Sequence, residues 1–280
     1  MEKKRRNKDI TIGKIIEVPK GQRLRNRVMI GIPMTGLLRA EWVLGRYGQV
    51  VPCNWSQVDC IQFLDQYTPL NFLVADGRNI IIKNFMEGNF EWLWFIDHDV
   101  ILPTYTVLKW NERMLSGDIP VWGGLYFTKS VPSEPLVYRG RGNSFYNKWK
   151  IGDQVWVDGM GMGNTIIHRS IIEEMWKDSK SYVVGNVHTR QVFESPAKTW
   201  FDPETKSWFN FGGTEDLAWC SRVMDEGYFK KAGWSKYQGK EYPFLVDTTV
   251  FSKHIDFDGT QYPARGEEQF FSVKIKSIKG

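Results

Sequence analysis

The chain has 280 residues, of which 42% are hydrophobic and 25% are charged, and this composition is typical of a folded globular protein. Its formal charge of +5 is unevenly spread, because residues 1–27 hold ten Lys and Arg against three Asp and Glu. No apolar run approaches the ~20 residues of a membrane span, no secretory signal is recognisable, and three cysteines without a CxxC pair argue against a structural zinc site.

The chain opens with a predicted basic arm, residues 1–27. Its positive charge suits contact with an anionic lipid surface or a nucleic acid, while the plainer interpretation is a solvated tail that aids solubility. Partly alternating stretches at residues 10–18 and 271–278 are predicted as edge strands. Together with the cysteine content, these features predict a cytoplasmic protein that can lie peripherally at a membrane.

Strands and helices alternate through the first 125 or so residues. The run EWLWFI at 91–96 is apolar throughout, as in a strand buried on both faces of a parallel sheet. In chain order we predict a strand at 28–33, an amphipathic stretch at 39–47, a short strand near 49–55, a strand at 71–76, a helix at 78–88, the strand at 91–96, a helix from Pro103 to Gly117 and a strand at 121–127. The alternation predicts an α/β fold with a mostly parallel sheet flanked by helices.

The second half of the sequence is less regular. Residues 129–158 suggest a hairpin and loops, and residues 157–175 suggest a Gly-rich turn, a strand and a helix. A helix is predicted after Thr214. Its buried stripe would be Leu217, Cys220 and Met224, and Gly227 would end it. A last strand at 242–251 leads into SKHIDFDG. We therefore expect a smaller, loop-rich, partly antiparallel region after the first sheet strands.

Two acids follow the apolar strand at 91–96. In open α/β sheets ligands bind beyond the carboxyl ends of the strands, where Asp97 and Asp99 lie. If the chain stays extended there, the two carboxylates share a side and His98 points away. Two neighbouring carboxylates repel unless a cation lies between them, and oxygen ligands favour Mg²⁺ or Mn²⁺. The alternative is a pair of solvated loop acids.

Two further stretches add candidate functional groups. Glu215 and Asp216 occupy the first turn of the helix after Thr214, where acids favour the helix dipole by roughly 0.3–1 kcal/mol. A carboxylate at a helix start that faces a cleft is also well placed as a general base. His254 follows the last strand, where it is either a metal ligand or a structural histidine.

These stretches, in this order, resemble the GT-A-fold glycosyltransferases, and the chain is similar to family two, particularly its small stand-alone phage and bacterial enzymes. The resemblance runs from about Val28 to Asp256. It is carried by a first strand ending in proline, an Arg-Asn helix start, DHD after an apolar strand, a GG strand, GxG before an apolar strand, TEDLAWCSRVMDEGY, and a strand leading to His. Residues 230–241 depart from the pattern, because they lengthen the connection that precedes His254.

The resemblance implies roles for individual residues. Asp99 and His254 would ligate a divalent metal, with His254 shifting the preference from Mg²⁺ toward Mn²⁺. Asp97 would contact the ribose, or the metal through water. Asp216 would be the catalytic base, with Glu215 its neighbour or the true base. The implied contacts to the nucleotide sugar are Pro33, Arg78, Asp97, Gly161 and Gly163.

The function implied by the resemblance is a metal-dependent, hexosyltransferase-like transfer from a nucleotide-sugar donor to an acceptor hydroxyl, with inversion. The catalytic domain would span residues 28–280, with a nucleotide-binding half at 28–128 and an acceptor-binding half at 129–280. The acceptor stays open among a glycan, a protein, a lipid-linked sugar and modified DNA. Two other interpretations of the residues are a nucleotidyltransferase and a non-catalytic carbohydrate-binding protein.

Overall fold

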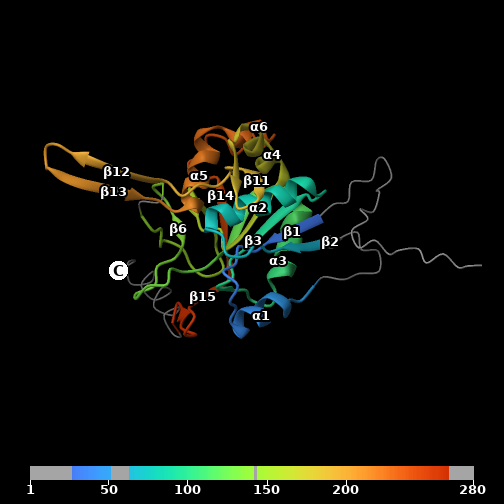
Figure 1. The fold of residues 1–280 in the computed structure, drawn as a ribbon. Helices are drawn as coiled ribbons and strands as arrows, with labels where there is room; N and C mark the ends of the chain where they lie inside the picture. Colours follow the sequence, from blue (N-terminus) through green and yellow to red (C-terminus); the bar gives the residue numbers. More distant parts are fainter. Residues whose placement is uncertain (1–26, 52–62, 142–143, 265–280) are drawn as a thin grey trace, which may run out of the picture.

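A computed structural model of the chain describes residues 27–51, 63–141 and 144–264. The predicted edge strands at 10–18 and 271–278, and all but the last residue of the basic arm, lie outside this described part. A seven-stranded sheet forms the centre of the molecule (Figure 1). In spatial order its strands are β2 (Phe63–Tyr67), β1 (Arg27–Gly31), β3 (Trp92–Ile96), β9 (Asn164–His168), β5 (Val121–Leu125), β14 (Phe244–Phe251) and β7 (Gln154–Val157).

Most strands of the sheet run in one direction. Strands β1, β2, β3, β5 and β14 are mutually parallel, whereas β9 is antiparallel to both β3 and β5 and β7 is antiparallel to β14. The predicted mostly parallel α/β sheet is therefore confirmed. Because β9 runs the other way, its first residue lies at the sheet edge where β3 and β5 end.

Helices cover both faces of the sheet (Figure 1). On one face Trp110 packs edge-on against Trp122, with ring centroids 6.2 Å apart. On the other face Phe95 packs against Phe193, with ring centroids 5.6 Å apart. None of the described helices is long and apolar enough to span a membrane. The helices are α1 (Ala40–Tyr47) and α3 (Thr106–Ser116) below the sheet in Figure 1, and α2 (Val74–Glu87), α4 (Arg169–Asp178), α5 (Glu215–Asp225) and α6 (Tyr228–Lys231) above it.

Several predicted elements are confirmed with small shifts of their ends. The apolar strand at 91–96 is β3, and all five of its residues are buried. The helix predicted from Pro103 begins three residues later, because the carbonyl of Pro103 accepts bonds from the backbone N–H and hydroxyl of Thr106 and closes a turn. It ends at Gly117, whose φ of 59° is the left-handed conformation that glycine adopts without strain.

The strand predicted at 71–76 is wrong, because α2 already begins at Val74. Leu73 and Val74 are 79% and 40% exposed, so this apolar run does not enter the core as a strand would. The neighbour of β1 is instead β2. The short strand predicted near 49–55 is also wrong for residues 49–51, which form no element, while residues 52–55 lie outside the described part. Gln49 instead donates hydrogen bonds to the carbonyls at the end of α1 and before α3.

The buried face of α5 differs from the predicted stripe. Cys220 is buried as predicted, but the other buried residues are Glu215, Trp219 and Val223, and Leu217 and Met224 are only partly buried. Trp219 lies on the inward face of α5, because its ring stacks on that of Phe193, with centroids 5.7 Å apart and an interplanar angle of 10°. The widest side chain therefore decides which face of α5 points inward.

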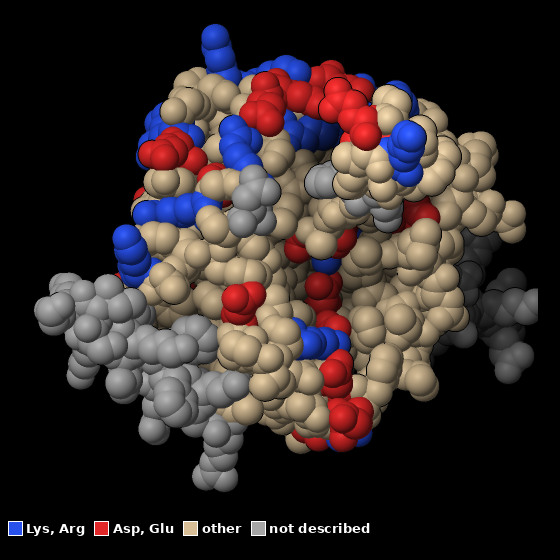
Figure 2. Space-filling model, turned by 90° about the vertical axis from the view of Figure 1, so that its left-hand side faces the viewer, with Lys and Arg blue, Asp and Glu red and all other residues tan. Residues whose placement is uncertain are grey.

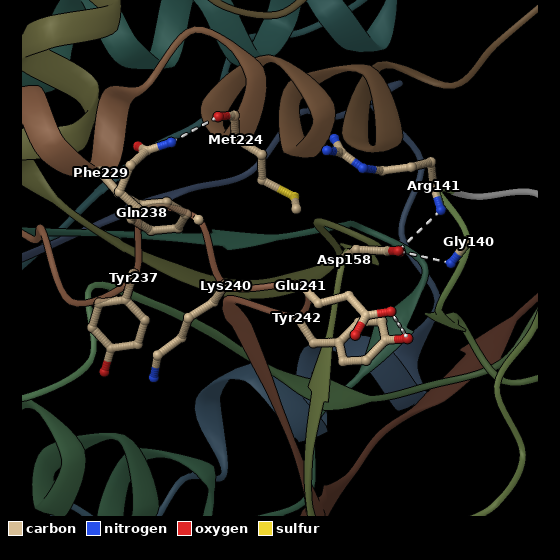
Figure 3. A pocket seen from close by; sticks show the side chains of 11 residues that line it. Gly140, Arg141, Asp158, Met224, Phe229, Tyr237, Gln238, Lys240, Glu241 and Tyr242 are labelled. Atoms are coloured by element: carbon tan, nitrogen blue, oxygen red, sulfur yellow. Dashed lines mark hydrogen bonds between the residues drawn. The ribbon is translucent and has the colours of Figure 1, made fainter.

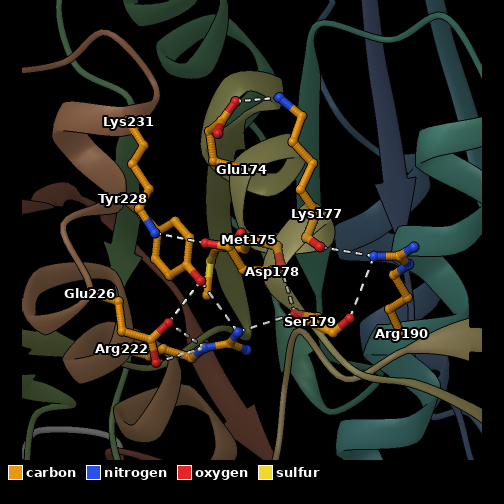
Figure 4. A network of polar contacts seen from close by, with 10 residues as sticks. All are labelled: Glu174, Met175, Lys177, Asp178, Ser179, Arg190, Arg222, Glu226, Tyr228 and Lys231. Atoms are coloured by element: carbon orange, nitrogen blue, oxygen red, sulfur yellow. Dashed lines mark hydrogen bonds and ion pairs between the residues drawn. The ribbon is translucent and has the colours of Figure 1, made fainter.

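A polar network joins α4, α5 and α6, which cover the same face of the sheet (Figure 4). Arg222 of α5 donates to the hydroxyl of Ser179 at 3.2 Å and pairs with Glu226 at 3.2 Å. Tyr228 donates to the same glutamate at 2.7 Å. Lys231 pairs with Asp178 at 2.7 Å. These contacts fix the position of α5, whose first turn carries Glu215 and Asp216.

The remaining strands form small sheets outside the central one. They are β4 (Val100–Ile101), β15 (Lys253–Ile255) and β16 (Gln261–Tyr262) in one sheet, β6 (Val137–Tyr138) with β8 (Gly159–Met160), β10 (Ser181–Val184) with β11 (Val187–Arg190), and β12 (Ala197–Asp202) with β13 (Ser207–Gly212). The β12–β13 hairpin extends away from the body of the molecule (Figure 1). It carries cross-strand aromatic pairs, Trp200 with Phe209 and Phe201 with Trp208, all of them at least 41% exposed.

Candidate functional site

The sequence-predicted site residues follow strands that end at one edge of the central sheet. Pro33 follows β1, Asp97 and Asp99 follow β3, and His254 follows β14. The antiparallel β9 begins at the same edge, so the Gly-rich segment before it arrives there as well. This is the edge where open α/β sheets bind ligands. The face from which the β12–β13 hairpin projects is hollowed into a groove that exposes acidic side chains with basic ones between them (Figure 2).

The DHD segment is a turn and not an extension of β3. The strand ends at Ile96, and the N–H of Val100 donates to the carbonyl of Asp97 at 3.1 Å. The expectation that Asp97 and Asp99 share one side of an extended chain is therefore wrong, because a turn sends the two carboxylates to different partners. His98 lies against Thr35 in the loop after β1, with Nε2 3.2 Å from the threonine hydroxyl, so it does not compete as a ligand beside Asp99 in this arrangement.

Arg78 joins the end of β3 to the start of α5. Its guanidinium Nη2 lies 3.0 Å from Asp97 Oδ1, and Nε lies 3.1 Å from Glu215 Oε1. Arg78 is 1% exposed, and although burial opposes its charge, Asp97 and Glu215 raise its pKa above the ordinary value. Burial also raises the pKa of Asp97, against the opposing effect of Arg78. The pair of contacts places a permanent cation between two acids predicted for the site.

Asp99 has two neighbours of different kinds. Its Oδ2 accepts an ion pair from Lys129 Nζ at 2.7 Å, and its Oδ1 lies 3.9 Å from Nε2 of His254. Lys129 also reaches Asp256, at 3.1 Å. Burial raises the pKa of Asp99, but the combined effect of His254 and Lys129 lowers it by more. The pKa of this carboxyl group is therefore below its ordinary value, and the group is ionised at neutral pH.

His254 presents a free ring nitrogen toward Asp99. Its Nδ1–H donates to the carbonyl of Phe127, which leaves the lone pair on Nε2. Burial lowers the pKa of His254, so the ring is neutral at neutral pH. The ring packs edge-on against Tyr126, with centroids 4.9 Å apart. A neutral imidazole with a fixed orientation is the form that ligates a metal ion.

The separation of Asp99 and His254 fits two ligands of one divalent ion. Ligand atoms lie about 2.1 Å from Zn²⁺ or Mg²⁺, so two of them can be up to about 4.2 Å apart. The observed separation of 3.9 Å lies within that limit, and adjacent ligands of an octahedral ion are about 3.0 Å apart, so a bound ion would draw the two groups slightly closer. Within the described ranges no group of three or more His, Cys, Asp and Glu side chains forms a metal site. The remaining ligands would come from phosphate oxygens and water, as is usual for Mg²⁺ sites that serve phosphorylated substrates.

Asp216 differs from its neighbour Glu215. Glu215 is buried and bonded to Arg78, whereas Asp216 is only partly buried and accepts a hydrogen bond from the N–H of Leu217 at 2.8 Å. Burial and the charge of Glu215 raise the pKa of Asp216 to about 6. A carboxylate with a pKa this close to neutral can accept a proton from a hydroxyl that is being activated, and release it again.

Gly161 and Gly163 make room for Tyr126 and Asp97. A Cβ on Gly161 would lie 2.0 Å from the hydroxyl of Tyr126, and one on Gly163 would lie 3.0 Å from Asp97 Oδ2. The N–H of Gly163 donates to the same hydroxyl at 2.8 Å. In the structure these glycines therefore fix Tyr126 in the site, and their predicted contact with the donor sugar stays a prediction.

Pro33 packs beside the start of α2. A Cβ on Gly77 would lie 3.3 Å from Cβ of Pro33. The next residue, Met34, pairs with Leu70 in an isolated bridge, and Thr35 reaches the DHD turn through His98. The loop after β1 thus borders the site, and its predicted place beside a nucleobase stays a prediction.

Sequence reasoning missed three side chains of the site: Lys129, Tyr126 and Asp256. The same edge rule could have found them, because Tyr126 and Lys129 follow β5 and Asp256 follows β15 beyond β14. What the sequence does not reveal is the pairing, since Lys129 meets Asp99 across 30 residues of chain.

A cavity of about 440 Å³ lies elsewhere, at the far end of α5 (Figure 3). Met224 and Phe229 line it together with polar residues, among them Asp158, which accepts hydrogen bonds from the N–H groups of Gly140 and Arg141 at 2.7 and 3.1 Å. With a rise of about 1.5 Å per residue, Met224 lies about 12 Å along the helix from Asp216. The cavity is therefore separate from the acid cluster at the sheet edge.

Comparisons with known proteins find similarity in solved structures alone. No protein-family model matches the chain, and no curated protein matches it. The crystal structure of A197 from STIV is similar with a TM-score of 0.48 and 16% identity, over 84% of this chain and 92% of that chain. The crystal structure of S. aureus TarS has a TM-score of 0.38 and 13% identity, over 88% of this chain and 38% of that chain. At such values neither similarity identifies a family or an activity for this chain.

Proposed function

We propose that the chain is a metal-dependent glycosyltransferase that moves a sugar from a nucleoside-diphosphate donor to an acceptor hydroxyl, with inversion. One observation carries the proposal. At a single sheet edge, Nε2 of His254 lies 3.9 Å from Asp99, and the buried Arg78 pairs with Asp97 of the same turn and with Glu215, the neighbour of Asp216, whose pKa is raised to about 6. The order of motifs that resembles GT-A glycosyltransferases supports the same interpretation.

The charge of the site supports the requirement for a metal ion. Two cations, Arg78 and Lys129, form ion pairs with carboxylates of the site. The site has five carboxylates: Asp97, Asp99, Glu215, Asp216 and Asp256. An anionic diphosphate would be repelled by this excess of negative charge. Asp99 and His254 would hold a divalent ion, preferably Mn²⁺ because of the imidazole ligand. When bound, that ion supplies Lewis-acid stabilisation of the negative charge that develops on the leaving diphosphate.

Asp216 carries the proton transfer in this proposal. Its carboxylate takes the proton of the acceptor hydroxyl as that oxygen attacks the anomeric carbon from the side opposite the leaving diphosphate. The carbon–oxygen bond to the acceptor forms as the bond to the diphosphate breaks, so one displacement inverts the anomeric centre. Glu215 does not compete for this role, because its carboxylate is bonded to Arg78.

The acceptor side of the proposal rests on the β12–β13 hairpin. This hairpin ends at Gly212, three residues before α5 begins with Glu215 and Asp216. Its exposed aromatic rings offer flat apolar faces on the element that precedes the proposed base in the chain. A sugar acceptor, free or lipid-linked, suits such faces better than a charged one.

The test is an incubation with a panel of nucleotide sugars in the presence and absence of Mn²⁺. Release of a nucleoside diphosphate that requires Mn²⁺ supports the transferase. Release of pyrophosphate would assign a nucleotidyltransferase instead. Binding of sugars without turnover of any donor would assign a non-catalytic carbohydrate-binding protein.

Asp99→Ala is expected to weaken Mn²⁺ binding by more than about 100-fold, because the loss of even an outer-shell partner costs about 10–100-fold in metal affinity, and to abolish Mn²⁺-dependent binding of the nucleoside diphosphate. The variant loses a charged ligand atom that lies 3.9 Å from the second ligand. Titration calorimetry with Mn²⁺ alone, and then with the diphosphate, measures both effects. Asp258→Asn is the matched control, because Asp258 is an exposed acid of the same loop region that bonds only locally to Thr260 in the described contacts. Equal Mn²⁺ affinity in Asp99→Ala and the control would contradict the assignment.

The transfer rate is expected to fall below pH 6, because the pKa of Asp216 is about 6 and only its ionised form accepts a proton. At saturating Mn²⁺, kcat should drop about tenfold for each pH unit below that value. The titratable groups that interact electrostatically with Asp216 include Glu215, Arg78, Cys220, Tyr126 and Tyr138, and burial raises the pKa of the thiol and of both hydroxyls, so these three groups stay neutral. A pH–rate profile with no fall on the acidic side would argue against an ionised Asp216.

A further inference from the structure

Lys129 occupies one side of the carboxylate that would bind the metal. Its Nζ lies 2.7 Å from Asp99 Oδ2 and 3.1 Å from Asp256 Oδ1, while Asp99 Oδ1 faces His254. An ammonium group on one oxygen of a carboxylate lowers the affinity of that carboxylate for any other cation. Lys129 is therefore placed to compete with the ion that Asp99 and His254 would hold.

The backbone that carries Lys129 is fixed, whereas its side chain can move. The N–H of Thr128 donates to the carbonyl of Glu134 at 2.8 Å, and the N–H of Glu134 donates to the hydroxyl of Thr128 at 3.0 Å. The side chain of Lys129 is 28% exposed, and a lysine ammonium sits on a flexible four-carbon stem. The ammonium can leave Asp99 without any movement of the main chain.

The same segment also orients the second ligand. The carbonyl of Phe127 accepts the Nδ1–H of His254, and Lys129 follows two residues later. Phe127 is anchored opposite Pro135 by an isolated bridge. The segment after β5 thus fixes the imidazole and carries the cation that neutralises Asp99 when no metal is bound.

We propose that Lys129 is a displaceable counter-ion, which holds Asp99 until a divalent ion binds and then pairs with the diphosphate of the donor. The pairing with the diphosphate rests on the proposed function, whereas the displacement rests on the metal site alone. Two cations on one carboxylate repel each other, so the ammonium leaves when the ion arrives. With a donor bound, the phosphate oxygens would be the anions available to the released ammonium of Lys129.

Lys129→Met is expected to tighten binding of Mn²⁺ alone by about tenfold or more, because a positive charge this close shifts charge equilibria by one or more powers of ten. Titration calorimetry without any donor measures this on the full chain. Lys109→Met is the matched control. It removes the same charge from a lysine that pairs with Glu112 on α3, away from the site. Equal affinity in Lys129→Met and wild type, or no Mn²⁺ binding by either, would overturn the proposal.

A second measurement uses the wild-type chain and does not depend on the folding of a variant. Acetylation of Lys129 by acetic anhydride, followed by mass spectrometry, is expected to become several-fold faster when saturating Mn²⁺ is added, because the amine is then no longer held between the carboxylates of Asp99 and Asp256. Lys231 is the control, because it pairs with Asp178 outside the site, and its acetylation rate should be the same with and without the metal ion. A rate at Lys129 that does not respond to Mn²⁺ overturns the displacement.

The two proposals fail in different ways. If Mn²⁺ binds and Lys129→Met tightens it, but no nucleotide sugar is turned over, the counter-ion role stands and the transferase does not. If donors are turned over with Mn²⁺ but Lys129→Met binds the ion no more tightly, the transferase stands and the counter-ion role falls.

Discussion

Asp216→Asn is expected to lower the transfer rate by about 10²–10⁴-fold, the usual contribution of a general base, while leaving donor affinity within twofold of wild type. The asparagine keeps an oxygen that accepts the hydrogen bond from the N–H of Leu217, so the first turn of α5 is preserved. It cannot take up a proton, so the acceptor hydroxyl attacks without assistance. Single-turnover rates with saturating donor and Mn²⁺ measure the loss, and calorimetry measures donor affinity.

The control for this substitution lies on the same helix. Asp225 is an exposed acid at the far end of α5 that pairs with Arg141 at 2.9 Å. Asp225→Asn makes the same chemical change and should leave the rate unaltered. An Asp216→Asn enzyme that retains more than a tenth of the wild-type rate would show that another group, or water, takes the proton.

Arg78→Met is expected to destabilise the protein by about 3–5 kcal/mol, the typical effect of removing one partner of a buried ion pair. The substitution leaves the carboxylates of Asp97 and Glu215 without the guanidinium that now lies about 3 Å from each of them. Two carboxylates then face each other in a site sheltered from water. For a chain of this size, a melting temperature lower by about 10 °C corresponds to such a loss.

Acidity should relieve part of this loss. Burial already raises the pKa of Asp97 and Arg78 opposes that rise, so without Arg78 the variant is least destabilised at acidic pH and loses stability as the pH rises toward neutral. Arg141→Met is the control, because Arg141 and Asp225 form a largely exposed pair whose loss costs about 1 kcal/mol or less. Calorimetric melts across pH separate the two. Melting of Arg78→Met within a few degrees of wild type would contradict a structural role for this cation.

Much of the site could be located from the sequence, because one rule applied to several strands. DHD, His254 and the GxG segment each adjoin a buried apolar strand, and parallel strands bring such neighbours to one edge. Glu215 and Asp216 were found in another way, as acids in the first turn of a well-marked helix. The rule identifies which residues arrive at the edge, and the structure agrees with it for each of these.

The sequence does not determine what each of these side chains contacts. A turn at Asp97–Val100 separates the carboxylates that an extended strand would have aligned, and the choice between strand and turn depends on contacts with Thr35 and Trp42 from distant segments. The inward face of α5 likewise depends on Phe193, which the local helical pattern does not include. Local patterns therefore predicted several of the elements, although not those at 49–51 and 71–76, and missed the partners.

The antiparallel β9 has a consequence for how the molecule is made. It lies between β3 and β5, yet it is synthesised after both, so these two strands have no partner across that gap until residue 168 has left the ribosome. Strand β14 joins β5 later still. Pairings this far apart in the chain form slowly, and for that interval two apolar strands, one of them carrying three aromatic rings, need protection from aggregation by a chaperone or by rapid translation.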